Sequence, residues 1–263
     1  MAEIITYAAA SGMKAAMMEI TNRTNNLANV NSLGYQAMEI ETKDTFYHQL
    51  TKAGIQESRD VGERPVGVQL GTGVKVTGTY RNLSEGTIKQ TSNPLDIAII
   101  GSGYFAVTLP NNQRAYTRGG AFQVNNQRQL VTSEGYALVD DITIPGNVQI
   151  STVSISSTGL ITASDNAGGL VQIGQLQIYG FVNERGLEQV GGGFFTENLT
   201  SGDGQANTPG DVGLGTLSQY QLVLSNVEIA TEFASFMAAQ QAYDMSSKML
   251  KAIDEMLKEL TKS

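Results

Sequence analysis

The sequence predicts an α+β fold, with one long helix at each end of the chain and a β-rich middle. Residues 4–30 contain no Pro and one Gly, and their apolar residues recur every three or four positions. Residues 226–261 show the same spacing. Between about residues 37 and 224, short apolar segments alternate with Gly, Asn and Pro. We expect the two helices to pair as a coiled coil and the middle to form an antiparallel β-sandwich or barrel.

The first helix is predicted by a stripe close to a coiled-coil seam. Its positions are Met13, Met17, Ile20, Leu27 and Val30, with Thr24 in the intervening slot. The second half is rich in Thr and Asn, which are poor helix formers. This segment is therefore expected to need partners in order to be helical.

The last helix is predicted to begin at Ser225, which would form a capping box with Glu228. Its stripe is built mainly from Ala and Met, which allow close and adaptable packing. The stripe comprises Val227, Ala230, Ala234, Met237, Ala242, Met245, Met249, Ala252, Met256 and Leu260. Three interpretations stay open: a terminal helix docked on its own domain, a pair between the two chain ends, or a bundle of several chains.

The chain is predicted to divide into three domains. Residues 1–32 with 226–263 form the helical domain, residues 33–75 with 214–225 an extended connector with hairpin character, and residues 76–213 an outer β-rich domain. Segments such as Val74–Thr79, Leu95–Ile100 and Tyr104–Leu109 read as strands. Residues 48–69 have no clear period and are expected to be extended.

Composition excludes several kinds of function. The 263 residues include no Cys, no Trp and one His, and the net charge is -8. Disulfides, thiolate nucleophiles and metal sites built from Cys or from several His residues are therefore excluded. An acidic chain also lacks the basic surface that nucleic-acid binding requires. Only 16% of residues are charged, but 17 Asn and 19 Gln are present, which suits surfaces that pack against copies of themselves. An ordinary amide-rich β protein would fit this composition equally well.

No enzyme motif is found. Gly71-Thr72-Gly73 and Gly101-Ser102-Gly103 lack the spacing of a dinucleotide loop. Asp140-Asp141 is a carboxylate pair, but adjacent residues on a strand point to opposite faces, whereas a glycosidase needs both carboxylates across one cleft. We expect no catalytic, cofactor or metal site. No window reaches the length of a membrane span, and the N-terminal segment lacks a basic signal-peptide region, so the chain is expected to be soluble and either cytoplasmic or exported without a cleaved signal.

Several segments together resemble the family of bacterial flagellar rod and hook proteins. The first is Asn25-Asn26-Leu27-Ala28-Asn29-Val30-Asn31-Ser32-Leu33-Gly34-Tyr35, which is similar to the end of that family's N-terminal helix. Ser225-Asn226-Val227 and Gln240-Gln241-Ala242-Tyr243 resemble the C-terminal helix motif. Asn93-Pro94-Leu95-Asp96 and Tyr116-Thr117-Arg118-Gly119-Gly120 follow the family order in the middle. The resemblance covers essentially the whole chain, and its length and order are closest to the rod members.

The resemblance implies a structural subunit that assembles helically, in many copies, into the distal part of a hollow rod. That rod would cross the periplasm to the outer membrane and transmit torque from motor to hook. The implied partners are other copies, proximal rod proteins, the hook protein, the peptidoglycan and outer-membrane ring proteins, and the flagellar type III export apparatus. No nucleic acid, membrane insertion or cofactor is implied. A hook or proximal rod protein, a non-polymerising adaptor and a peptidoglycan-active enzyme are the alternatives.

The resemblance also implies three sets of contact residues. In the N-terminal helix they are Met13, Met17, Ile20, Asn25, Asn26, Leu27, Asn29 and Val30. In the C-terminal helix they are Asn226, Val227, Ala230, Ala234, Met237, Gln241, Ala242, Tyr243, Met245, Met249, Met256 and Leu260. In the rod-specific connector, residues 47–64, they are Tyr47, Gln49, Gln56, Arg59 and Arg64. The sequence departs from the family pattern at Gln36, Tyr220, Val223 and Gln241, and within the helix at Asn22, Arg23 and Thr24.

Overall fold

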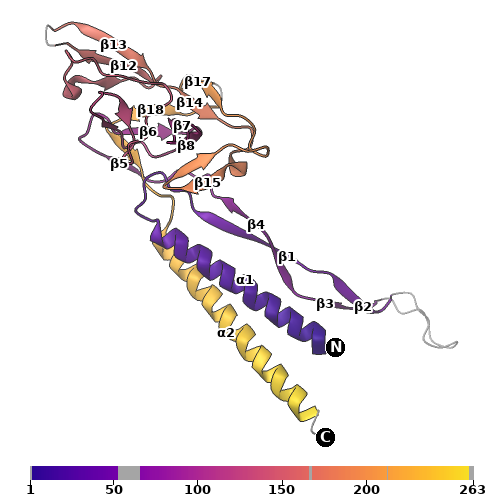
Figure 1. Ribbon diagram of the computed structural model, residues 1–263. Helices are drawn as coiled ribbons and strands as arrows, with labels where there is room; N and C mark the ends of the chain where they lie inside the picture. The colour runs from indigo at the N-terminus through magenta and orange to yellow at the C-terminus, as the bar shows by residue number, and fades with distance from the viewer. Residues whose placement is uncertain (1, 53–65, 166–167, 212, 261–263) are drawn as a thin grey trace. The chain divides into compact units, whose positions relative to one another are not determined.

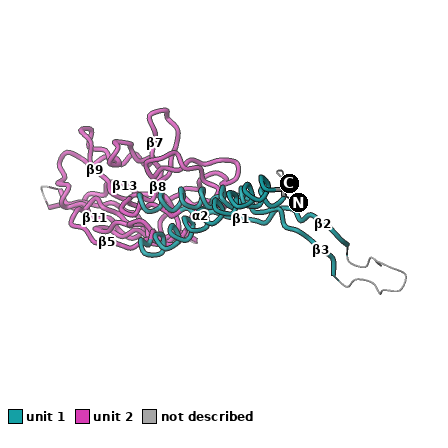
Figure 2. Tube along the Cα trace, turned by 90° about the horizontal axis from the view of Figure 1, so that it is seen from below, with its two compact units in different colours: residues 1–28, 38–80, 228–263 teal, residues 29–37, 81–227 magenta. Residues whose placement is uncertain are grey.

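The computed structural model describes residues 2–52, 66–165, 168–211 and 213–260. These residues form two compact units, which Figure 2 draws in different colours. Unit 1 comprises residues 1–28, 38–80 and 228–263, and unit 2 comprises residues 29–37 and 81–227. The predicted α+β chain, with a helix at each end and a β-rich middle, is confirmed.

In unit 1 the helices α1 (Ala2–Ala28) and α2 (Ile229–Leu260) pack side by side, with both chain ends at the same end of the pair (Figure 1). Arg23, near the end of α1, meets Glu232, near the start of α2. Gly12 lies opposite Ser246 further along. The two helices are therefore antiparallel.

The predicted capping box at the start of the last helix is wrong. Ser225 Oγ accepts a hydrogen bond from Val227 N (3.2 Å) and closes a turn ahead of α2. The chain stays non-helical there because Asn226 N donates to Tyr35 O (3.3 Å) and Val227 packs in a small cluster with Tyr35. The helix begins only at Ile229, and the Glu228 carboxylate accepts from Thr231 Oγ1 (2.8 Å).

Unit 1 also contains two ribbons, each made of two hydrogen-bonded strands. β1 (Met38–Asp44) pairs with β4 (Val74–Arg81), and β2 (Tyr47–Thr51) pairs antiparallel with β3 (Val68–Gly71). Part of the segment that was expected to be an extended connector is therefore hydrogen-bonded strand.

Unit 2 is built from small sheets. Its largest sheet has the strand order β15-β16-β8-β7, a second has the order β11-β12-β13, and the others are two-stranded. All the pairs of these sheets run antiparallel. The bounds are β5 Ile88–Gln90, β6 Ile97–Ile100, β7 Phe105–Thr108, β8 Arg114–Thr117, β9 Gln123–Val124, β10 Leu130–Val131, β11 Ser154–Ile155, β12 Leu160–Ser164, β13 Leu170–Gln175, β14 Ile178–Gly180, β15 Glu188–Gly191, β16 Phe194–Thr196, β17 Gln205–Asn207, β18 Thr216–Gln219 and β19 Gln221–Val223, with short 3-10 helices at Ile150–Thr152 and Glu184–Gly186.

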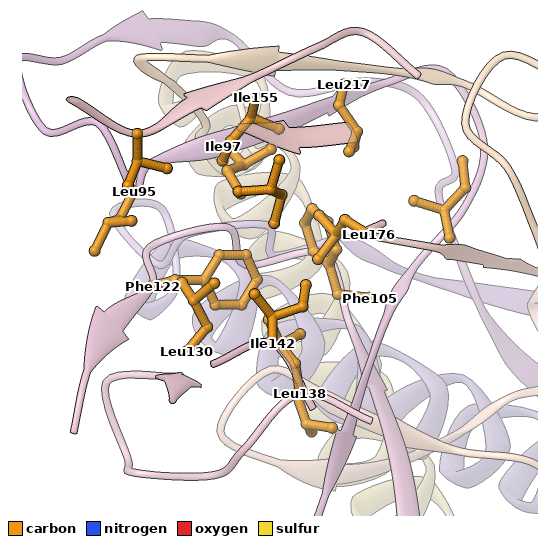
Figure 3. Packing of buried hydrophobic residues seen from close by; sticks show 14 of the residues in the cluster. Leu95, Ile97, Phe105, Phe122, Leu130, Leu138, Ile142, Ile155, Leu176 and Leu217 are labelled. Atoms are coloured by element: carbon orange, nitrogen blue, oxygen red, sulfur yellow. The ribbon is translucent and has the colours of Figure 1, made fainter. Parts of the chain in front are cut away.

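The larger of the apolar clusters in unit 2 gathers side chains from several of these sheets (Figure 3). Phe105 and Phe122 meet edge to face at its centre, with ring centroids 5.0 Å apart. Side chains from β6, β11 and β18 complete it, among them Ile97, Ile155 and Leu217. Because each small sheet contributes only a few core residues, the sheets depend on one another for burial.

Candidate interaction surfaces

One side of α2 contacts α1. Its residues follow steps of four and three, which is the spacing of a helix pair with a seven-residue repeat. Glu232, Ala239 and Ile253 on this side are buried. The half-buried members are Phe236, Tyr243, Ser246, Leu250 and Leu257. We call this set the α1-facing seam.

The stripe that the sequence predicted for α2 lies mostly outside this seam. Tyr243 belongs to the seam, and Asn226 and Val227 precede the helix. The exposed members are Ala230, Ala234, Met237, Gln241, Ala242, Met245, Met249, Ala252 and Met256. Leu260 ends the helix, and its side chain lies outside the described residues. Of the interpretations left open, this exposure favours contacts with other chains, although the set itself stays a prediction.

The exposed side of α2 carries two separate apolar patches. Six large side chains between 44% and 67% exposed define them. Ile229, Phe233 and Met237 form the N-terminal patch, and Met245, Met249 and Met256 form the C-terminal patch. Each step of four residues turns 40° further around a helix, so the stripe moves from one flank of α2 to the other as it passes Gln241. The two patches can therefore contact two different neighbours.

The predicted residues of the first helix divide in the same way. Met17 is 60% exposed. Met13, Ile20 and Leu27 are half-buried within unit 1. Asn25 is exposed, and Asn29 and Val30 follow the end of α1. Only Met17 and Asn25 of this set present most of their side chain outward.

Asn26 and Asn226 have intrachain roles that the sequence did not reveal. Asn26 is fully buried; its Oδ1 accepts from Met38 N and its Nδ2 donates to Met38 O, both at 2.9 Å. In unit 2, Asn226 Oδ1 accepts from Ala37 N (2.7 Å), and its Nδ2 donates to Asn82 O (2.9 Å) and Ser84 O (3.0 Å). Each side-chain amide thus supplies the backbone partners that an extended segment would otherwise lack.

Arg23 joins α1 to α2. Its Nη1 donates to both carboxylate oxygens of Glu232 (3.1 and 3.2 Å), and its Nε donates to Glu19 (2.7 Å). The pKa of Arg23 is raised: burial alone would lower it, but the hydrogen bond to Glu19 and the charges of Glu19 and Glu232 outweigh that effect. The sequence singles out Glu232, which is the only charged residue between positions 229 and 243, but it does not identify the partner of Glu232.

The connector residues are placed only in part. Tyr47 and Gln49 lie on β2 and are exposed. Gln56, Arg59 and Arg64 lie outside the described residues. Several large apolar side chains of the β2–β3 ribbon and its flanks are also exposed: Phe46, Tyr47, Leu50, Val66 and Val68. A two-stranded ribbon is marginal on its own, so this surface is a second candidate for contact with a neighbour.

Two departures from the family pattern have structural consequences. Gln36 is buried, and its Oε1 accepts from Arg81 Nη1 (3.2 Å). The guanidinium of Arg81 therefore lies beside this position, and burial lowers the pKa of Arg81. Tyr220 has a φ of 60° and so occupies the left-handed backbone region, which favours Gly.

The carboxylate pair weighed as a catalytic candidate has structural partners. Asp140 Oδ2 accepts from Gln177 N (3.0 Å), and Asp141 Oδ1 accepts from Gln129 Nε2 (2.9 Å). Among the described residues, no group of three or more His, Cys, Asp or Glu side chains could hold a metal ion. In the same part of the chain, no helix is both long and apolar enough to cross a membrane.

The sequence matches two family models. One, described as the flagellar hook protein FlgE/F/G D1 domain, covers residues 98–163. The other, described as the flagellar basal body rod FlgEFG protein C-terminal, covers residues 219–263.

Curated relatives match over nearly the whole chain. The flagellar basal-body rod protein FlgG of Caulobacter vibrioides is 40% identical over 250 residues, which are 95% of each chain. The FlgG of Borreliella burgdorferi is 36% identical over 252 residues, again 95% of each chain. The FlgG of Bacillus subtilis is 33% identical over 259 residues, which are 97% of this chain and 96% of the relative.

Proposed function

The chain belongs to the FlgG family of flagellar basal-body rod proteins, and we propose that it builds the distal part of the rod by helical self-assembly. It is a structural subunit of the flagellar basal body. Many copies would form a hollow, rigid shaft that crosses the periplasm and carries torque from motor to hook. We propose no catalytic activity. Because the matched relatives are named as rod proteins, the hook, adaptor and enzyme alternatives are not favoured.

The exposed face of α2 carries this proposal. Six large apolar side chains lie on the side of α2 that α1 does not cover. Completing their burial contributes on the order of 1 kcal/mol each, whereas association costs about 4–15 kcal/mol. One patch therefore cannot hold a pair of chains, and several neighbours must bind together. Where each patch binds a different surface of a neighbouring copy, the contacts are heterologous, and heterologous contacts that do not close into a ring generate helical assemblies.

The finer architecture belongs to the same proposal. The seven-residue repeat of the α1-facing seam supports a coiled coil between α1 and α2. The small antiparallel sheets around one core support a sandwich- or barrel-like outer body. Residues 1–32 with 226–263 would form the inner layer of the tube, residues 33–75 with 214–225 the connecting layer, and residues 76–213 the outer layer. Residues outside the terminal helices would then face the peptidoglycan and outer-membrane rings, and the tube ends would meet the proximal rod and the hook.

Export before assembly is the last part of the proposal. We propose passage through the flagellar type III apparatus without a cleaved signal, as the similarity to rod proteins implies.

Electron microscopy of three full-length chains tests self-assembly. The wild-type chain at high concentration should form straight tubes. Met249→Lys should form none, because it places a charge in the C-terminal patch. Asp254→Lys, the control, places a positive charge at an exposed position on another flank of α2, away from both patches, and should still assemble. All three should unfold at the same temperature, because both positions are exposed. Equal assembly of the two variants, or a wild-type chain that never forms tubes even on isolated basal bodies, would overturn the proposal.

A shortened ribbon tests the role of the connector. Thr45 N donates to Gly73 O (3.0 Å) and Thr72 N donates to Phe46 O (3.2 Å), so the base of the ribbon is closed. Replacing residues 47–71 by Asn-Gly should leave that base intact and remove the exposed apolar contacts. We expect curved or supercoiled tubes. Tubes as straight as those of the wild type would show that the connector does not stiffen the rod.

A further inference from the structure

Unit 1 contains an apolar groove that no described part of its own chain fills. It lies between α1 and the β1–β4 ribbon and has a volume of about 450 Å³. Tyr7 and Met18 of α1 and Val74 and Val76 of β4 supply apolar walls. Lys14 and Lys75 also line it, both exposed and both without an ion pair among the residues that the structure describes.

Direct contacts between the ribbon and α1 fix the shape of the groove. Gly73 has a φ of 122°, and a Cβ there would collide with Ser11 Oγ and lie 3.0 Å from Ala8 Cα. Ser11 Oγ in turn accepts a hydrogen bond from Val74 N (3.2 Å). The ribbon backbone is therefore held against α1 at closest approach, and the walls are set before anything binds.

The groove cannot be filled by the α2 of the same chain. α2 packs on the side of α1 that carries Gly12, Ala16 and Arg23. Tyr7, Lys14 and Met18 lie on the other side of α1, about half a turn away at 100° per residue. A helix entering this groove must come from another molecule.

The end of α2 has the complementary chemistry. Figure 1 shows α2 running past the first turn of α1. In this part Met256 is 60% exposed, and Glu255 and Glu259 beside it are exposed. Neither carboxylate forms an ion pair within the described ranges. Met245, Ala252 and Glu259 are spaced by seven residues and so share one flank of α2 with the C-terminal patch.

We propose that the groove receives the C-terminal end of α2 from a second copy of the chain. Met256 would lie between the apolar walls, with Glu255 and Glu259 beside Lys14 and Lys75. This deepens the proposed function and rests on it, because it assigns one contact of the polymer. Groove and helix end are different surfaces of the same unit, so the contact is heterologous, and its repetition extends a filament.

Site-specific crosslinking tests the proposal against a clean background, because the chain contains no Cys. An Ala10→Cys chain is mixed with a Met256→Cys chain under assembly conditions and treated with a short bis-maleimide. We expect a crosslinked dimer of the two chains. In the control mixture, Ala238→Cys replaces Met256→Cys and should give at least about tenfold less dimer. Equal yields from the two mixtures would overturn the groove assignment.

The same experiment separates this inference from the proposed function. Tubes without the specific crosslink would overturn the groove contact and leave helical assembly standing. The specific crosslink without tubes would support the groove contact and count against a rod subunit. Neither tubes nor crosslink would overturn both.

A charge exchange supplies a second, independent test. Lys14→Glu with Lys75→Glu should raise the critical concentration for assembly about tenfold or more, since like charges then face each other. Glu255→Lys with Glu259→Lys should do the same. Combining all four changes in one chain should bring the critical concentration back to within about threefold of the wild-type value. Lys89→Glu is the control for a charge change elsewhere in the chain. If the variant with all four changes assembles no better than either double variant, the assignment is overturned.

Discussion

Arg23 and Glu232 lie 209 positions apart in the sequence and meet across α1 and α2, where one guanidinium nitrogen contacts both carboxylate oxygens. Glu232 is buried, and Arg23 is also bound to Glu19. Because a buried ion pair contributes little net stability but is costly to break, its main effect is to fix the register of the two helices. The antiparallel offset of α1 and α2 follows from this contact and from the close approach of Gly12 to Ser246.

Breaking this pair should destabilise the helices unequally. Arg23→Ala leaves the Glu232 carboxylate buried without its partner and should cost about 3 kcal/mol. Glu232→Ala leaves Arg23 with Glu19 and should cost about 1 kcal/mol. The double variant Arg23→Ala/Glu232→Ala removes both charges together and should cost about 2 kcal/mol, less than the sum of the two single variants. Urea unfolding followed by far-ultraviolet circular dichroism measures all three.

The control is Lys43→Ala, which breaks the exposed pair with Glu41 and should cost less than about 0.5 kcal/mol. Additive single and double effects would contradict the view that Arg23 and Glu232 act as one unit.

The two adjacent asparagines of the N-terminal motif should respond very differently to substitution. Asn26→Ala removes both hydrogen bonds to Met38 inside unit 1 and should cost about 2–3 kcal/mol. Asn25→Ala alters an exposed residue of the same helix and should cost less than about 0.5 kcal/mol. Thermal unfolding of the monomer checks both. If Asn25→Ala also blocks assembly while the monomer keeps its stability, then Asn25, and not Asn26, contacts a neighbouring chain.

The sequence predicted the terminal helices but not which of their faces touch. The predicted stripe that includes Met237, Met245 and Met249 does follow steps of three and four over most of its length. These side chains are nevertheless exposed. The seam buried against α1 follows the same steps of three and four, with Phe236, Leu250 and Ile253 among its members, but Glu232 and Ser246 interrupt its apolar character. A period identifies a face of a helix, and it cannot tell whether that face meets the same chain or another copy. The partner of Glu232 lies 209 positions away, so only the tertiary fold reveals it.

The middle was predicted as β structure with less detail, for a related reason. β6 and β7 are short apolar runs and were expected. β15 and β17 are exposed along their length and contain polar residues or Gly, so no alternation marks them. β2 and β3 lie in the segment without a period, and their pairing depends on the cross-strand register of Tyr47 with Gly71. Pairing between exposed strands leaves little trace in hydropathy.

The protein should be more stable with Gly than with Ala at position 220. The φ of Tyr220, 60°, lies in the left-handed region, which costs roughly 1–2 kcal/mol for a residue with a Cβ. The position is held there because Thr91 N donates to Tyr220 O (2.8 Å). We expect Tyr220→Gly to exceed Tyr220→Ala by about 1 kcal/mol in unfolding free energy. At the exposed strand residue Tyr47 the order should reverse, because Gly weakens a strand. The same order at both positions would contradict the backbone argument.

Asp140 should make unit 2 more stable in acid than at neutral pH. Burial raises the pKa of this carboxyl above its ordinary value of 3.8, and the hydrogen bond from Gln177 N and the charge of Arg114 only partly oppose that effect. The native state therefore holds the proton more tightly than the unfolded state does. As pH rises from the ordinary pKa through the raised one, the unfolded state ionises first, and the free energy of unfolding falls.

Asp140→Asn removes this titration and keeps an oxygen that can accept from Gln177 N. The variant should be more stable than the wild type at pH 7, and its advantage should shrink as pH falls to 3, where the wild-type carboxyl is protonated and equally neutral. Calorimetric unfolding temperatures across this range measure the difference. Asp203→Asn removes one charge at an exposed position and should show no such dependence. A difference between Asp140→Asn and the wild type that stays constant from pH 3 to pH 7 would mean that burial of Asp140 is not linked to the stability of unit 2.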